Sequence, residues 1–131
     1  MPTKIPFDFV VESLMPLHPR VKHMFGAFAV YVGEKIVLVL RDRESHEEAN
    51  GVWIATSSEH HASLKREFPN MCSVYLLSDG KAETEWQMLP LSADDFESSV
   101  MKVCEFILKG DRRIGRVPKA RKRKKKKENH G

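Results

Sequence analysis

The residues with the clearest chemical potential are the cations at the end of the chain. From residue 111 onward there are 11 Lys and Arg residues against two acids, a net charge of +9. Each cation that neutralises a phosphate releases condensed counterions, so such a segment binds nucleic acid in a salt-sensitive, sequence-independent way. The segment has no aromatic residue, and we therefore expect contacts to phosphates rather than to bases. The predicted phosphate contacts are Arg112, Arg113, Arg116, Lys119, Arg121, Lys122, Arg123, Lys124, Lys125, Lys126 and Lys127.

The same charge pattern divides the chain into two parts. Residues 1–110 carry a net charge of −5 and are long enough for one domain with a modest core. Residues 111–131 are poor in apolar side chains, and like charges repel one another, so we predict a disordered tail that orders on a polyanion. Two alternatives stay open for this tail, a purely solubilising role and a localisation signal.

A second group of cations lies at the first predicted hairpin and its exit. Lys35, Arg41 and Arg43 are predicted as secondary phosphate contacts, and Arg20 and Lys22 would extend the same surface. The acidic balance of the folded part opposes a specific nucleic-acid groove there, because it repels polyanions.

The two tryptophans of the chain have two interpretations. Trp53 and Trp86 lie in runs that read as strands. We favour positions in the core or on a sheet face. The alternative is that they form platforms on which bases stack.

No catalytic constellation is evident in the sequence. None of the six histidines has the spacing of a zinc site. His46 precedes two acids as in a metalloprotease helix, but Asn50 stands where the second histidine is required. Ser57-Ser58 lacks a G-x-S-x-G elbow and fits helix capping, and no glycine-rich phosphate loop occurs. We therefore predict a non-enzymatic protein with no metal site and no cofactor.

One alternative, a small enzyme or ligand binder with a pocket between sheet and helices, stays open. It would require convergence of His23, Tyr31, Cys72 or Glu85. Cys72 and Cys104 are too few for a disulfide framework and too far apart for a metal knuckle. We expect both to be reduced and mostly buried thiols.

The sequence also predicts the cellular location of the protein. No run approaches the ~20 consecutive apolar residues of a membrane span. The first residues lack the apolar stretch and cleavage site of a secretory signal. We predict a cytoplasmic protein without membrane contact, and the sequence carries no signal for its oligomeric state.

The first half of the chain predicts a helix and a hairpin. Apolar residues recur with helical spacing over 6–15. Two β-rich runs, 27–32 and 35–40, are separated by Gly33-Glu34, which suits a type II′ turn. The charged stretch 41–51 predicts an exposed loop.

The second half predicts three further strands, two helices and a turn. Residues 52–55 favour a third strand, and Ser57 or Ser58 would cap a helix that ends near Phe68. Strands over 72–77 and 83–88 flank a turn at 78–81. A last helix is predicted from an N-cap at Ser92 to Gly110.

Together these elements predict an α+β domain over residues 1–110. Consecutive hairpins indicate an antiparallel sheet, here two hairpins plus one strand. Helices with one apolar stripe must pack on one face of that sheet, which gives two layers.

The run from Val21 to Val32, which includes Met24-Phe25-Gly26, resembles the opening signature of the TfoX N-terminal domain and of MmcQ/YjbR-like proteins. The strand with Trp86 that leads into Leu89-Pro90, and the stretch 109–115, are also similar. The resemblance covers about residues 7–110. It implies a double-wing α+β domain, DNA binding and no catalytic constellation. The basic tail is not a feature of that family, and Gly26-Ala27 stands where members often have two glycines.

These observations predict a non-enzymatic DNA- or RNA-binding protein that contacts phosphates mainly through its basic tail. The alternative is a protein-interaction or regulatory module whose tail only solubilises it or binds an acidic partner.

Overall fold

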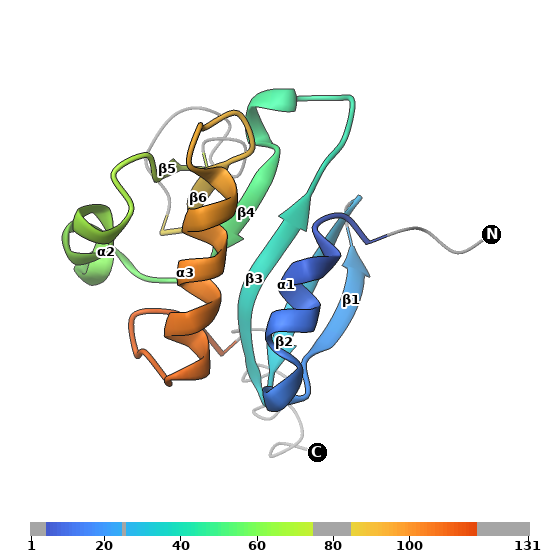
Figure 1. Cartoon of the computed structure of the whole chain (residues 1–131), viewed down its shortest axis with the longest axis vertical. Helices are drawn as coiled ribbons and strands as arrows, with labels where there is room; N and C mark the ends of the chain where they lie inside the picture. Colours follow the sequence, from blue (N-terminus) through green and yellow to red (C-terminus); the bar gives the residue numbers. More distant parts are fainter. Residues whose placement is uncertain (1–4, 25, 75–84, 118–131) are drawn as a thin grey trace, which may run out of the picture.

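The computed structural model describes residues 5–24, 26–74 and 85–117, and these form an α+β fold around one sheet (Figure 1). The six antiparallel strands have the order β1-β2-β3-β4-β6-β5. This confirms the predicted α+β class and antiparallel sheet, with one strand more than we predicted. The strands are β1 (Arg20–Met24), β2 (Ala27–Val32), β3 (Lys35–Arg41), β4 (Gly51–Ile54), β5 (Cys72–Ser73) and β6 (Gln87–Pro90).

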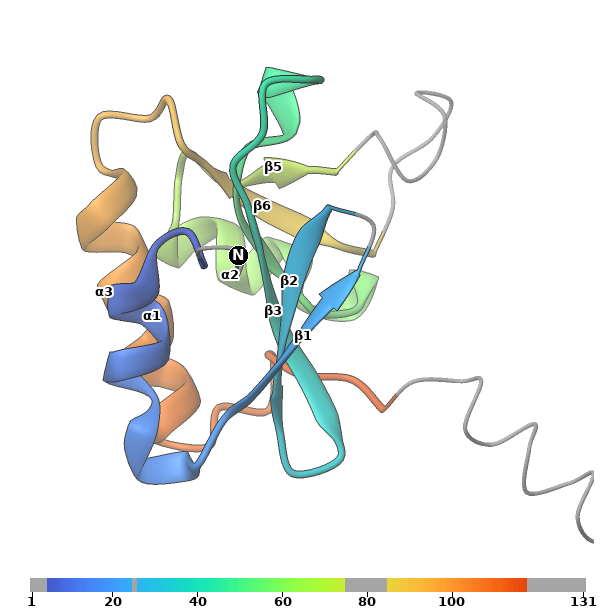
Figure 2. The same ribbon diagram turned by 90° about the vertical axis from the view of Figure 1, so that its right-hand side faces the viewer.

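The helices share one apolar core with one face of the sheet. Helices α1 and α3 lie side by side on that face (Figures 1 and 2). Leu64 of helix α2 and Phe68, which directly follows this helix, belong to the same core. The described helices are α1 (Asp8–Ser13), α2 (His61–Glu67) and α3 (Phe96–Leu108), with 3-10 turns η1 (Met15–Leu17), η2 (Glu47–Ala49) and η3 (Ser58–His60).

Strands β2 and β3 form the predicted hairpin around Gly33-Glu34. Val32 pairs with Lys35 on the two sides of the turn. Gly33 has a φ of 62°, the sign that the first central residue of a type II′ turn requires. A Cβ at this position would meet no atom within 4 Å, so the turn needs glycine for its backbone conformation and not for space.

Strand β1 is an element that the sequence did not reveal. It forms the sheet edge and pairs along its whole length with β2. Arg20, Lys22 and His23 are exposed on it, so the strand lacks the apolar alternation by which strands are recognised. Charged side chains are common on edge strands because they discourage pairing with other chains.

The prediction of an exposed loop over 41–51 is wrong at its two ends. Arg41 is the last residue of β3 and is buried, and Asn50 is buried as well. The Asn50 side chain closes the loop, since its Oδ1 accepts from the Arg43 N–H at 2.9 Å and its Nδ2 donates to the Arg43 carbonyl at 2.7 Å. Residues 42–48 between these positions are exposed, as expected.

The predicted helix after β4 is present but shorter. A 3-10 turn precedes α2, and Ser57, at the start of that turn, makes no side-chain cap bond. In the second hairpin Cys72 pairs with Met88 and Ser73 pairs with Gln87. The remainder of that predicted hairpin, residues 75–84, lies outside the described residues.

Helix α3 follows the predicted apolar stripe but begins later. Asp95 and not Ser92 occupies the N-cap position. The C-terminus confirms the prediction, because Gly110 has a φ of 79° and ends the helix. Its N–H donates to the Ile107 carbonyl, and the Asp111 N–H donates to the Phe106 carbonyl, both at 3.0 Å. This pair of bonds is a Schellman motif.

Candidate functional site

The sheet face away from the helices carries a second apolar cluster. On β4, Trp53 alternates with Val52 and Ile54, which belong to the helix-packed core, so Trp53 points to the opposite face. Figure 2 shows α1 and α3 on one side of the sheet only. We call the opposite side the helix-free face. Its buried residues are Ala27, Ala29, Ile36, Val39, Trp53, Ala55, Val74 and Met88, together with Ala49 of η2.

A pocket of about 350 Å³ opens on the helix-free face. We call it the tryptophan cup. The rings of Trp53 and Trp86 meet edge to face, 6.3 Å apart at 67°, and Trp53 Nε1 donates to the Ala49 carbonyl at 2.9 Å. Its apolar lining is Met24, Ala27, Ile36, Val39, Trp53 and Trp86. Its polar lining is Arg41, Arg43, Ser45 and His46, so none of the described lining residues is acidic.

Arg41 is not the surface contact that the sequence predicted. Its side chain is only 3% exposed, because it turns inward at the end of β3. The guanidinium donates to the carbonyls of Ser45 and His46 and to Asn50 Oδ1, at 2.8 to 2.9 Å. Arg41 is therefore not a surface phosphate contact, and it lines the tryptophan cup.

The charge of Arg41 has no carboxylate within 4.0 Å in the described part of the chain. Burial lowers its pKa from the usual arginine value, the like charge of Arg43 lowers it further, and Glu48 opposes part of this change. An arginine this buried is normally paired with an acid. The charge of Arg41 is therefore held by carbonyl and amide oxygens and only in part by Glu48.

Arg43 is exposed and connects the cup to the loop after β1. Its guanidinium packs over Gly26, whose φ is 74°, and a Cβ at Gly26 would overlap Arg43 Nη1. Glycine at this position thus permits close approach of the guanidinium to the backbone. Arg43 is the predicted secondary cation that the structure leaves both exposed and at a pocket.

The first residues of the basic segment are fixed to the sheet. Arg116 and Ile36 exchange two backbone hydrogen bonds of 2.9 Å, and the Gly115 N–H donates to the Ala55 carbonyl at 2.6 Å. Strand β4 pairs only with the second half of β3, from Leu38 to Arg41. The segment pairs with Ile36, in the first half of the same strand. It passes to the helix-free face, as Figure 2 shows in orange. The stem of exposed Lys35 packs on Gly115, with its Cδ 3.2 Å from the position of a Cβ there.

Two of the predicted phosphate contacts are paired with acids of the protein itself. Arg116 Nη1 lies 2.6 Å from Glu85 Oε1. Arg113 binds both carboxylate oxygens of Asp111, donates to Ser63 Oγ at 2.6 Å and stacks over Phe106 at 5.2 Å. Both arginines therefore have structural roles. Arg112 is exposed. Lys119 and the run 121–127 lie outside the described residues.

The pair of Asp111 and Arg113 predicts an acid-sensitive contribution to stability. Hydrogen bonds from Arg113 are the main cause that lowers the pKa of Asp111 below its usual value. The stabilisation is complete above the unfolded-state pKa of about 3.9 and is lost as the pH falls through the lower folded-state pKa. Asp111→Asn should cost about 2 kcal/mol at neutral pH. In urea unfolding from pH ~7 to ~3 the variant should lose less stability than the natural protein. Parallel pH profiles of the two proteins would contradict this.

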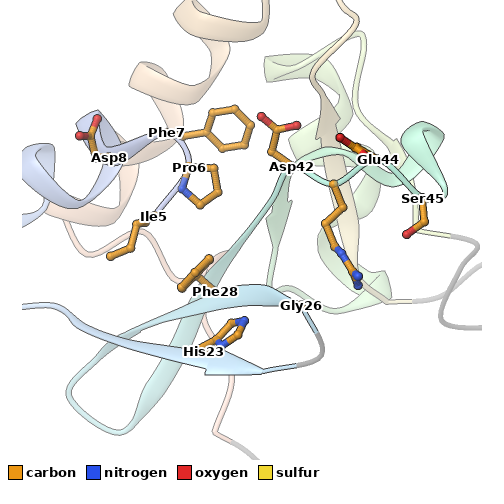
Figure 3. Close-up of a pocket in the computed structure, with 11 residues that line it drawn as sticks. Ile5, Pro6, Phe7, Asp8, His23, Gly26, Phe28, Asp42, Glu44 and Ser45 are labelled. Atoms are coloured by element: carbon orange, nitrogen blue, oxygen red, sulfur yellow. The ribbon is translucent and has the colours of Figure 1, made fainter. Parts of the chain in front are cut away.

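A second, wider pocket of about 1050 Å³ lies between the N-terminal segment, β1, β2 and the loop after β3 (Figure 3). His23 stacks on Phe28 at its base, with ring centres 4.7 Å apart. Asp42 and Glu44 approach from the loop on the far side. The lining combines the cation Arg43 and acidic side chains with apolar rings. Among the described residues, no acid lies within hydrogen-bond reach of His23.

The side chains named for an enzymatic alternative lie in separate places. His23 lines the wide pocket, Tyr31 lies under Arg20 with its ring 5.3 Å from the guanidinium, and Glu85 pairs with Arg116. Burial raises the pKa of Cys72, and raises that of Cys104 to about 11, so both thiols stay protonated at neutral pH. Both cysteines are free; Cys104 is buried, as predicted, whereas Cys72 is only half-buried. Within the described residues no three His, Cys, Asp or Glu side chains gather as metal ligands would.

Comparison with known proteins gives no relative, since no family model, curated protein or solved structure matches this chain. Among the described residues, no helix has both the length and the apolar character needed to cross a bilayer.

Sequence reasoning located the basic segment but missed the tryptophan cup. The signal for a second apolar face is present, because Val52-Trp53-Ile54-Ala55 is apolar at every position instead of alternating. That pattern indicates a strand covered on both faces. It does not show that Trp86 would lie against Trp53, since their meeting depends on the pairing of β4 with β6.

Proposed function

We propose that this protein is a non-enzymatic, cytoplasmic nucleic-acid-binding protein whose basic C-terminal segment contacts phosphates. One observation carries the proposal. The β-bridge between Arg116 and Ile36 fixes the start of that segment to the sheet and directs it to the helix-free face. Because Ile36 also lines the tryptophan cup, the described start of the segment lies next to that pocket.

Charge separation supports this arrangement. The body is net acidic and the segment from residue 111 is net +9, so attraction of a polyanion falls to the segment. Exposed Lys35, Arg43 and Arg112 add cations to the described body. Screening restricts exposed charges to a range of ~10 Å at 0.1 M salt, so only cations near the bound strand contribute.

The resemblance to TfoX N-terminal and YjbR-like domains supports the same conclusion. The α+β class agrees with the double-wing domain that the resemblance implies. We propose membership of that group on the residues from Val21 to Val32.

The proposal predicts a strong and salt-dependent effect of the lysine run. Changing Lys124, Lys125, Lys126 and Lys127 to Ala in the full-length protein removes up to four phosphate contacts. The slope of log affinity for duplex DNA against log salt should then become shallower by up to about 3.6, because each contact contributes about 0.9. Fluorescence anisotropy between about 50 and 200 mM salt measures this slope.

Changing the same four lysines to Arg is the matched control. This variant keeps every charge and should keep the natural slope, since the slope reports the number of neutralised phosphates. An unchanged slope in the Ala variant, or binding too weak to detect in the natural protein at low salt, would overturn the proposal.

The structure also contains an observation that favours the protein-interaction alternative. Met101 and Leu108 are exposed one above the other on α3. The Ser13 hydroxyl lies 3.7 Å from Met101 Sδ, which brings exposed Met15 to the same surface. Methionine surfaces adapt to varied partners. This alternative predicts that the anisotropy titration shows no nucleic-acid binding, so the same experiment separates the two functions.

A further inference from the structure

The tryptophan cup has the dimensions of a site for one flat ring system. Its volume of about 350 Å³ is near the lower end of ligand pockets. Trp53 and Trp86 meet edge to face at one apolar cavity, and because Trp53 is only 7% exposed, half-buried Trp86 presents the larger indole surface. Aromatic side chains of this kind bind bases by stacking, irrespective of base identity, because every base has a π-face.

The described lining of the cup carries two guanidinium groups and no acid, which suits an anionic ligand. Arg41 is buried without a carboxylate within 4.0 Å in the described residues, and Arg43 adds a second guanidinium at the same cavity. Guanidinium groups bind phosphate oxygens in pairs of parallel hydrogen bonds. Arg43 makes no ion pair with a described acid, so its donors are available on the exposed side.

The geometry points to single-stranded nucleic acid as the ligand: one unstacked base enters the tryptophan cup, and its phosphate binds Arg43 with the positive field of Arg41 behind it. This inference rests on the proposed function and narrows its substrate class. A base within a duplex is stacked and paired on both sides, and it cannot enter a cavity without leaving the helix. Duplex nucleic acid therefore contacts the basic segment and the exposed cations near it, without a base in the cup.

The tryptophans themselves report occupation of the site. The chain has only two, and both line the cup, so intrinsic fluorescence follows this site alone. Titration of the full-length protein with oligothymidylate should quench the emission. A duplex of the same length should bind without comparable quenching.

Variants at the cup should change the preference for single strands. Trp86→Leu keeps an apolar side chain but removes the stacking surface, and should weaken binding of labelled oligothymidylate about 10-fold, which corresponds to about 1.4 kcal/mol. Arg43→Gln should weaken it about 5-fold, or about 1 kcal/mol. Duplex affinity should change less than about 2-fold in Trp86→Leu, and in Arg43→Gln it should fall less than the affinity for oligothymidylate. Arg66→Gln, which removes an exposed cation from α2, should alter neither affinity.

The outcomes separate this inference from the proposed function. Equal losses for single and double strands, or no loss in either cup variant that retains the natural unfolding transition, would overturn the inference and leave the basic segment as the binding site. If neither nucleic acid binds at low salt, the proposed function fails, and titration with adenosine monophosphate then tests the cup by itself. Quenching by the mononucleotide would support a base site, and unchanged fluorescence would overturn it.

Discussion

Gly51→Ala should lower the free energy of unfolding by about 4 kcal/mol, the largest loss expected from any single methyl group added to this sheet. Gly51 is buried at the start of β4, with a φ of 148° that side chains rarely adopt. A Cβ there would overlap the Leu89 carbonyl oxygen and lie 3.0 Å from the Leu91 nitrogen. These atoms belong to backbone, so they cannot move aside as a flexible side chain would.

The expected loss of stability has two physical causes. A strained backbone conformation costs about 1–3 kcal/mol, and overpacking costs about 1–3 kcal/mol more. The sum is a large part of the total stability of about 5–15 kcal/mol that domains possess. Urea denaturation followed by fluorescence or circular dichroism measures the difference.

Gly33→Ala is the matched control. Gly33 also has a positive φ, but an added Cβ would meet nothing within 4 Å. Its cost should be limited to the conformational strain, about 1 kcal/mol. If the two variants lose the same stability, close backbone approach between β4 and β6 is not what requires glycine at position 51.

Arg41→Met should destabilise the protein by about 3 kcal/mol. Methionine keeps most of the aliphatic length but leaves the Ser45 carbonyl, the His46 carbonyl and Asn50 Oδ1 without the donors that they have in the natural protein. Losing the partner of a buried polar group costs about 1–3 kcal/mol, and relief of a buried unpaired charge offsets part of the total. Chemical denaturation of the two proteins gives the value.

Arg43→Met tests whether the effect is specific to the buried arginine. Arg43 is two residues away in the same loop, but its side chain is exposed. Its replacement should change stability by less than about 0.5 kcal/mol. A comparable loss in both variants would show that the loop tolerates neither change and that burial of Arg41 is not the cause.

The two variants with the largest expected effects concern the same part of the structure. Arg41 and Gly51 pair with one another at the end of the β3–β4 ladder. The loop between them places Ser45 and His46 at the tryptophan cup. The precise shape of the cup therefore depends on a buried arginine and on the close approach of two strands.

The local pattern of residue types was sufficient to predict several elements of the fold. The hairpin around Gly33 and the stripe and Schellman end of α3 depend on residues close in sequence, so their spacing predicts them. Strand β1 was missed because its side chains are largely charged, and its pairing with β2 comes from neighbours beyond the local pattern. The start of α3 was misplaced because Ser92 and Asp95 are both good N-cap residues, and packing of Phe96 favours the later one.

Some features of the candidate site could likewise be predicted from the sequence, and others could not. Composition alone locates the cations after residue 111 and predicts phosphate as their partner, since this needs only charge and its density. It could not show that Arg113 and Arg116 pair with acids. Arg116 pairs with Glu85, far away along the chain, and Asp111, although nearby, binds Arg113 only through the conformation of the turn after α3.

The sequence by itself determined that this is an α+β protein with an acidic body, a strongly basic C-terminal segment and an amphipathic last helix, because charge, composition and periodicity are properties of residues near one another. The tertiary structure decided which arginines are free and where the segment joins the sheet. It also decided that Trp53, Trp86, Arg41 and Arg43 share one cavity. The physical reason is that these features arise from the pairing of β4 with β6 and of Ile36 with Arg116, contacts between residues far apart in the chain.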